Sequence, residues 1–233
     1  MVRVGKNNIS FIISGLIICS LLMLMVVNKG KYFLTLSFGC LIFSMFPFYL
    51  NFEKKKIKAR EVIFIAVLSA IAAVSRIPFA PLPSVQPVSF IVIVSALVLG
   101  PESGFIVGAT SAIVSNIFLG QGPWTPWQMF CWGLMGITAG LIRNRKWAKN
   151  KYFLCAFGFI WGFLFGWIMN MWYVVAYISP INLKSVMAAY VASFYFDLMH
   201  ALSNVFFIYF FYSSWYRIID RFKKKYGILI AKD

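Results

Sequence analysis

The chain has 233 residues, of which 61% are hydrophobic and 12% are charged, and its mean hydropathy is +0.83. Soluble domains are nearer to half apolar and a quarter charged, so this composition excludes an ordinary water-soluble protein and predicts a chain whose solvent is lipid. The formal net charge of +16 would suit nucleic acid, but the basic residues lie in short segments between apolar stretches, where they orient membrane helices. Nucleic acid is therefore not an expected partner.

Apolar stretches that can act as membrane spans recur along the whole chain. A bilayer core needs about 20 apolar residues per helix, and lipid offers no partner to an exposed backbone, so the spans are expected to be α-helices. We expect an all-α integral membrane protein of eight spans. They cover residues 9–27, 32–50, 61–76, 87–99, 103–119, 126–142, 152–176 and 186–212, of which 87–99 is the shortest. The basic start of the chain resembles a signal peptide, but no small-residue cleavage site follows Val27, so we expect a retained helix.

Lys and Arg are distributed unevenly between the connections. They cluster at the N-terminus and after the second, sixth and eighth spans, whereas the other side carries only Lys29, Lys31, Arg76 and Lys184. The positive-inside rule then places both termini in the cytoplasm, which requires an even number of spans. Eight spans satisfy this requirement.

A basic connector at residues 51–60 divides the chain into two parts. Residues 1–56 form an N-terminal transmembrane hairpin with its basic connector, which serves either as an accessory element or as a partner-binding element. We expect residues 57–233 to form a six-helix membrane domain that ends in a basic cytoplasmic tail. We expect function in this second part, which is rich in Gly, Pro, Trp and polar residues. Its two turn-rich outer loops, residues 77–86 and 120–126, should be stiff because proline fixes φ.

Polar side chains inside the six-span domain are the candidate site residues, because each costs free energy in lipid unless it faces the bundle interior or a wet cavity. They are Arg76, Gln86, Asn116, Gln121, Gln128, Asn170, Asp197, His200 and Asn204. The last span spaces Tyr190, Ser193, Asp197, His200 and Asn204 by three or four residues, so they share one helical face. We expect that face to look inward.

Several roles are open for these residues. Asp197 and His200 could form a helix–helix clamp, contact a ligand or relay a proton. Asn116 and Asn170 could join helices or face a ligand. Arg76 could pair with Asp197, bind an anionic ligand group or extend to the headgroups.

The aromatic segment 120–128 combines Trp124 and Trp127 with two prolines and two amides at the mouth of the bundle. It is either an aromatic belt at headgroup depth or a ligand lid, since small-molecule pockets combine rigid aromatic surface with a few polar groups.

Small residues mark positions where helices can approach closely. Ala66 and Ala70 form one such ridge, and Gly104, Gly108 and Ala112 form another. Each ridge serves either packing within the bundle or docking of another subunit.

Motifs for catalysis or for bound cofactors are not found in the sequence. The four cysteines lie in apolar stretches without metal or redox spacing, and there is no phosphate-binding Gly-rich loop, His/Cys cluster or nucleophile elbow. We therefore expect no catalytic residue, metal or cofactor, and any ATP hydrolysis must come from other chains. An intramembrane enzyme that uses Asp197 and His200 is the alternative, but it lacks a nucleophile or metal set.

Four stretches carry a family resemblance over about residues 57–215. They are Ala66-Val-Leu-Ser-Ala70, Pro83-Ser-Val-Gln-Pro87, Leu99-Gly-Pro-Glu-Ser-Gly-Phe-Ile-Val-Gly108 and GQGPWTPWQMFCWGLMG at 120–136. They resemble the S components of energy-coupling factor (ECF) transporters, which are six-helix proteins of the bacterial plasma membrane that bind a vitamin on the outer side.

The resemblance implies a binding subunit that delivers its vitamin through the membrane subunit EcfT and two ATPases. It further implies that Ala66 and Ala70 match the family's Ala-xxx-Ala motif, which packs against EcfT. The 120–128 stretch is most similar to the cobalamin-specific CbrT group, and riboflavin, pantothenate, pyridoxine and queuosine precursors are the alternative substrates. The two N-terminal spans depart from the six-helix pattern.

Overall fold

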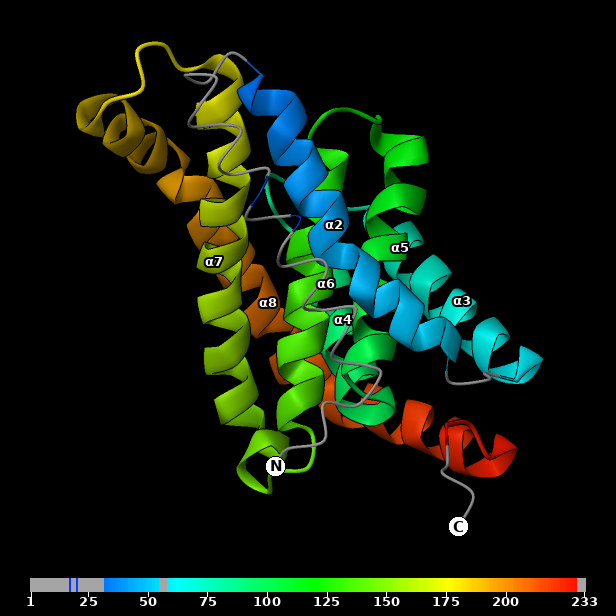
Figure 1. The fold of residues 1–233 in the computed structure, drawn as a ribbon. Coiled ribbons are helices and arrows are strands. Elements are labelled where there is room, and N and C mark those ends of the chain that lie inside the picture. The colour runs from blue at the N-terminus through cyan, green and yellow to red at the C-terminus, as the bar shows by residue number, and fades with distance from the viewer. Residues whose placement is uncertain (1–16, 18–19, 21–31, 55–57, 230–233) are drawn as a thin grey trace, which may run out of the picture.

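The computed structural model describes residues 17, 20, 32–54 and 58–229, and its regular elements in these ranges are all helices (Figure 1). They are α2 (Phe33–Lys54), α3 (Ala59–Val74), α4 (Pro87–Leu99), α5 (Pro101–Leu119), α6 (Thr125–Ile142), the 3-10 helix η1 (Trp147–Lys149), α7 (Lys151–Tyr177) and α8 (Leu183–Tyr226). The all-α prediction is confirmed for these residues, and most helix ends lie within a few residues of the predicted spans. The first predicted span lies almost entirely outside the described residues.

Three helices in the described ranges are long and apolar enough to cross a membrane. They are α5, residues Lys151–Val174 of α7, and α8. Helix α4 and residues Phe38–Pro47 of α2 are shorter apolar helices. The number of eight spans and the cytoplasmic position of the termini stay predictions.

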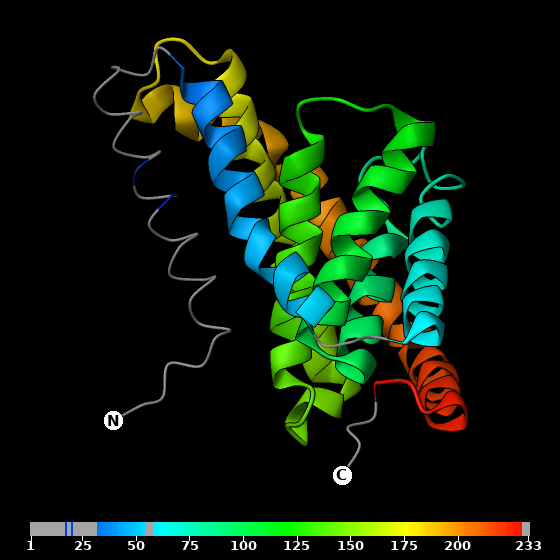
Figure 2. The same cartoon turned by 45° about the vertical axis from the view of Figure 1, so that its right-hand side comes forward.

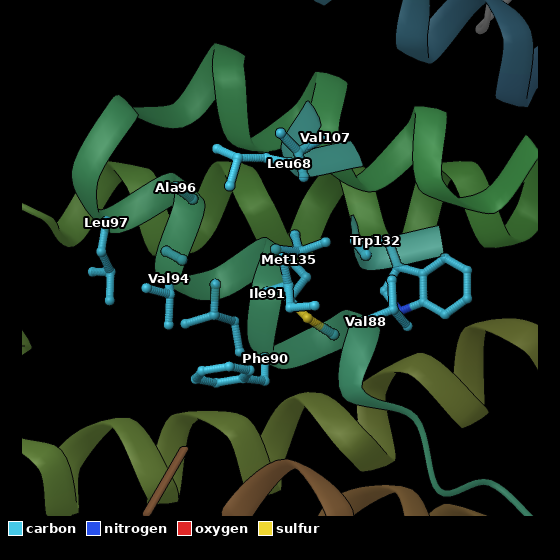
Figure 3. Close-up of a cluster of buried hydrophobic side chains, with 14 of the residues drawn as sticks. Leu68, Val88, Phe90, Ile91, Val94, Ala96, Leu97, Val107, Trp132 and Met135 are labelled. Carbon is cyan, nitrogen blue, oxygen red and sulfur yellow. The ribbon is translucent and has the colours of Figure 1, made fainter. Parts of the chain in front are cut away.

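Helix α4 forms the centre of the bundle. All 13 of its residues are buried, because the segment PVSFIVIVSALVL has no polar face, and a helix that is apolar all round must be surrounded by other elements. Figure 3 shows its side chains beside Leu68 of α3, Val107 of α5 and Met135 of α6. The shortest predicted span is thus the helix around which the others pack.

Glycines allow α5 and α6 to pack backbone to backbone. A Cβ atom on Gly136 would lie 2.3 Å from the Gly104 carbonyl oxygen, and one on Gly108 would lie 2.4 Å from the Trp132 carbonyl oxygen. Both obstructing atoms belong to the backbone, so rotation of a side chain cannot relieve either contact. The ridge of Gly104, Gly108 and Ala112 is therefore an internal packing surface.

Helix α2 packs across the face formed by α5 and α6 (Figures 1 and 2). Its buried Met45 clusters with Phe105 and Ile137, and the Tyr49 ring meets the Phe105 ring edge to face at 5.5 Å. Helix α2 is thus joined to α5 and α6 by apolar contacts.

Successive helices run in alternating directions, so their connections gather at two ends of the bundle (Figure 2). We call one end the turn-rich end; it carries residues 75–86, 120–124 and 178–182. The other is the basic end; it carries the start of α3, residues 143–150 and the C-terminal part of α8.

Helix α8 continues to Tyr226, well past residue 212, where the last span was predicted to end and a basic tail to begin. An Asp220–Lys224 ion pair of 2.6 Å supports the added turns at i,i+4 spacing. The segment beyond the helix is held by Glu61, whose Oε1 accepts a hydrogen bond of 2.8 Å from the Leu229 N–H. The basic segment is thus ordered by contacts with α3 that lie far away in the sequence.

Candidate functional site

Residues 75–86 fold into successive tight turns, as their prolines predict. The N–H groups of Phe79, Ala80 and Leu82 each donate to the carbonyl three residues earlier, at 3.2, 3.2 and 2.9 Å. Against these turns lies a cavity of 240 Å³ lined by Arg76, residues of the 79–86 turns and Leu119 of α5, which we call the loop pocket. Gln86 also lines it; its N–H donates to Ser203 Oγ at 3.0 Å, while its buried Oε1 has no hydrogen-bond partner.

Arg76 lies just after α3 and turns into the bundle. Its side chain is 8% exposed, and its Nη1 donates to Ser115 Oγ and, at 3.1 Å, to Asn116 Oδ1. The guanidinium carbon lies 4.8 Å from the centroid of the Trp132 ring, a cation–π arrangement that also orients the guanidinium. Of the three roles open for Arg76, pairing with Asp197 and extension to the headgroups are therefore not seen.

Asn116 extends this network from α5 to the 120–128 segment. Its Nδ2 donates to Thr125 Oγ1 at 2.9 Å and to Gln128 Oε1 at 2.7 Å, and the Thr125 hydroxyl donates to Gln121 Oε1 at 2.9 Å. Four predicted site residues, Arg76, Asn116, Gln121 and Gln128, are thus brought together at the turn-rich end.

The two tryptophans of the aromatic segment flank this network without lining the loop pocket. Trp124 is half-buried and meets Trp172 of α7 edge to face, with ring centroids 5.8 Å apart. Trp127 is buried, and its indole Nε1 has no hydrogen-bond partner. A buried indole is not the usual state of a residue in an exposed aromatic belt.

His200 joins three helices beneath Arg76. Its Nε2 lies 2.8 Å from Ser89 Oγ of α4, and Ser89 Oγ also accepts a hydrogen bond of 3.1 Å from Trp132 Nε1. With that acceptor position occupied by the indole, the Ser89 hydroxyl can donate to the imidazole. Trp132 thus contacts both Arg76 and Ser89, the partner of His200.

Asp197 and Asn170 belong to a second polar chain, between α7 and α8. The Ser193 hydroxyl donates to Asp197 Oδ2 at 3.0 Å and accepts from Asn170 Nδ2 at 2.5 Å. Asp197 fits where α7 has Gly166, because a Cβ atom there would lie 1.9 Å from Asp197 Oδ1. No hydrogen bond joins Asp197 to His200 among the described residues, since the helical step turns Asp197 toward α7 and His200 toward α4.

Asn204 is completely buried, and its Nδ2 donates to the Gly158 carbonyl of α7 at 2.9 Å. This contact matches a helix–helix clamp. Of the five residues on the predicted inward face of the last span, Asp197, His200 and Asn204 are buried, whereas Tyr190 and Ser193 are half-buried.

Sequence reasoning missed five residues of these polar contacts: Ser89, Ser115, Thr125, Trp132 and Ser203. The serines lie on apolar helices, where a small hydroxyl ordinarily packs or bonds its own backbone. Thr125 and Trp132 stand within the family-like stretch at 120–136, which was the available signal.

Residues 60–210, well over half of the chain, match the family model of the ECF transporter substrate-specific component. Among curated proteins, a UPF0397 protein of Vibrio atlanticus is 27% identical over 89 residues, which is 36% of this chain and 48% of the relative. A UPF0397 protein of Aliivibrio fischeri is 27% identical over 91 residues, 37% of this chain and 49% of the relative. The chain thus spans about half the length of the curated relatives it matches. No solved structure matches it.

The family match and the apolar helices agree on the setting of the chain. A transporter component with several apolar helices is a multi-pass protein of the cell membrane. The match also identifies a transport subunit rather than an enzyme, so the alternative of intramembrane catalysis by Asp197 and His200 is set aside. This chain belongs to the family of substrate-specific components of ECF transporters.

Proposed function

We propose that the chain binds a vitamin at the turn-rich end, facing the outside of the cell, and delivers it through EcfT and two ATPases. The loop pocket is the observation that carries this proposal. A buried arginine and a buried amide oxygen line it, and a hydrogen-bonded network from α5 and α6 holds the arginine in place. Concave sites that combine apolar walls with a few positioned polar groups are typical of small-molecule binding.

Two observations bear on the identity of the vitamin: the resemblance of the 120–128 stretch and the volume of the loop pocket. The 120–128 stretch favours cobalamin by its resemblance. The loop pocket, at 240 Å³, is smaller than the roughly 300–1,000 Å³ of pockets for drug-sized ligands, so a corrinoid requires the 77–86 turns to move aside. Riboflavin, pantothenate, pyridoxine and queuosine precursors demand less movement. Native mass spectrometry of the purified protein, which reads the mass of a retained ligand, tests the proposal; a protein that retains and takes up none of these compounds would contradict it.

Trp124 and Trp127 flank the polar network beside the loop pocket, and we propose that a ligand that moves the 77–86 turns aside reaches their rings. Trp124→Ala and Trp127→Ala are then each expected to weaken ligand binding about thirtyfold, because truncation of an anchoring Trp costs about 2 kcal/mol or more. Calorimetric titration of the retained ligand measures this effect. Trp147→Ala, an exposed tryptophan at the basic end, is the control and should bind as wild type does. Unchanged binding by both indole variants would assign Trp124 and Trp127 to packing.

Asn204→Ala should instead lower the melting temperature of the ligand-free protein, since it removes the α7–α8 clamp.

We expect cysteines at Pro123 and Lys224 to react from opposite sides of the membrane, because the basic end should face the cytoplasm. Both positions are exposed, and the experiment uses a background without the four native cysteines. Labelling of intact cells with a membrane-impermeant maleimide should modify position 123 and spare position 224. The reverse pattern would invert the topology.

The proposed contact with EcfT is the surface of α3 around Ala66 and Ala70. Both alanines are exposed, and a neighbouring apolar groove of 440 Å³ runs between α3 and the C-terminal part of α8. Small residues let the backbone of a partner helix come close, so this surface suits a helical partner within the membrane.

A further inference from the structure

The guanidinium of Arg76 uses the donors along one of its edges for hydrogen bonds within the protein, whereas the donors along another edge are free. A guanidinium offers five N–H donors in a fixed planar fork. Both contacts with Ser115 and Asn116 use Nη1, and neither Nε nor Nη2 has a hydrogen-bond partner in the part of the chain that the structure describes. The Nε atom is nevertheless buried, so this strong donor has neither solvent nor a protein acceptor as its hydrogen-bond partner.

The positive charge of Arg76 also lacks a counterion among the described residues. Asp197, the acid that the sequence offered as a partner for Arg76, is bonded to Ser193. Glu61, the buried acid of α3, accepts hydrogen bonds from the N–H groups of Lys58 and Leu229 at the basic end. The Trp132 ring gives only the weaker attraction of an aromatic face. A buried charge without a partner is strongly unfavourable. Binding of an anion beside Arg76 would therefore lower the free energy of the site.

The free edge has the geometry that a two-oxygen anion requires. Nε–H and Nη2–H lie side by side in the guanidinium plane and donate in parallel to a carboxylate or phosphate. Ser115 and Asn116 hold the opposite edge, and the Trp132 ring supports the flat face, so the direction of the fork is fixed before a ligand arrives. Arg76 lines the loop pocket, where Gln86 adds a buried oxygen that has no donor.

We infer that the substrate of the loop pocket carries a carboxylate or phosphate group, which binds the Nε–Nη2 edge of Arg76 in bidentate fashion. A hydroxyl or N–H group of the same substrate donates to Gln86 Oε1. The inference rests on the proposed binding function and narrows its substrate class. Pantothenate, which has a carboxylate, hydroxyls and an amide N–H, meets these requirements, whereas riboflavin and pyridoxine have neither a carboxylate nor a phosphate group.

Matched pairs of compounds test the inference with the wild-type protein, so no variant has to fold. Pantothenate is compared with panthenol, in which an alcohol replaces the carboxylate, and riboflavin 5′-phosphate with riboflavin. Calorimetric titration of the purified protein should give an anionic member that binds at least about thirtyfold more tightly than its neutral partner, the ratio expected for loss of a buried charge pair. The pair that responds separates carboxylate from phosphate recognition.

Arg76→Gln should abolish the preference for the anion, and Arg76→Lys should restore only part of it, because an ammonium has charge without a fork. Arg145→Gln, at an exposed position of the basic end, should leave the preference intact. Native mass spectrometry of wild type and Arg76→Gln identifies any retained compound.

The outcomes separate the inference from the function on which it rests. A tightly bound neutral vitamin, or an anion whose affinity is unchanged in Arg76→Gln, would overturn the inference and leave the binding function standing. A retained phospholipid that Arg76→Gln releases would assign the edge to a lipid headgroup and overturn the substrate inference. Failure to bind or retain any small molecule would count against the proposed function itself.

Discussion

Gly136→Leu is expected to disrupt the bundle, because no space for a side chain exists where α5 and α6 meet. Even a Cβ atom would lie 2.3 Å from the Gly104 carbonyl oxygen. Overpacking of a core costs about 1–3 kcal/mol when side chains can adjust, and here the obstructing atoms are backbone, so we expect a loss at or above the upper end of that range. Thermal unfolding of the detergent-solubilised protein, followed by circular dichroism, measures the loss.

The same change at a lipid-facing position serves as the control. Ala156 is exposed on α7, so Ala156→Leu adds a larger side chain without a steric clash inside the chain and should melt close to wild type. Gly136→Leu should in addition reduce the monodisperse fraction in size-exclusion chromatography. If the two variants melted together, the close packing of α5 on α6 would be wrong.

The all-α class and most helix ends could be predicted because lipid excludes open strand edges and irregular backbone from membrane spans. An exposed backbone has no partner in a bilayer, so long apolar runs become helices, and the prolines and glycines between them set the ends. Pro87 begins α4 and Gly100 ends it with a φ of +105°, a value that side chains other than glycine rarely adopt. The central position of α4 was not predicted, since a membrane span and a buried core helix are both apolar.

The end of α8 could not be predicted from local pattern. The residues after 212 are too polar for a span. Glu61 holds the segment that follows the helix, and other groups of the basic end contact the helix itself. Lys223, for example, donates from Nζ to the Val98 carbonyl at 2.8 Å. Such contacts join residues more than a hundred positions apart and leave no local signal in either segment.

The candidate site, too, could be predicted from the sequence only in part. Inward-facing polar residues could be predicted because unpaired polar groups are costly in lipid. Their partners on other helices could not, since that choice depends on how neighbouring helices rotate. The Ser193–Asp197 hydrogen bond follows from i,i+4 spacing along α8. The contact of His200 with Ser89 depends instead on how α4 packs against α8, and spacing along one helix does not reveal it.

Ala70→Trp should eliminate transport while leaving substrate binding within about twofold of wild type. Ala70 is exposed on α3, so an indole there meets no side chain of the bundle and does not disturb the loop pocket at the turn-rich end. A helical partner that approaches this small-residue surface would be held away by the added ring. Ala66→Trp, one helical turn earlier and equally exposed, should behave in the same way.

Binding and assembly are measured separately to distinguish docking from folding. Calorimetric titration reports substrate affinity, and affinity purification of the tagged subunit with co-expressed EcfT and ATPases reports assembly. Recovery of EcfT should fall at least about tenfold, which corresponds to 1.4 kcal/mol of lost association free energy. Ala192→Trp, at an exposed alanine in the outer part of α8, is the matched control and should assemble normally.

The groove beside the alanines provides a second measurement of the same surface. It is lined by Val67 and Ile71 of α3 and by Trp215 and Phe222 of α8, and apolar side chains that stay in lipid do not require a partner to cover them. Ile71→Ser would thus change little in the isolated subunit but should weaken recovery of EcfT if the partner helix fills the groove. Normal recovery by both Ala70→Trp and Ile71→Ser would remove α3 from the contact and transfer the docking surface to another face of the bundle.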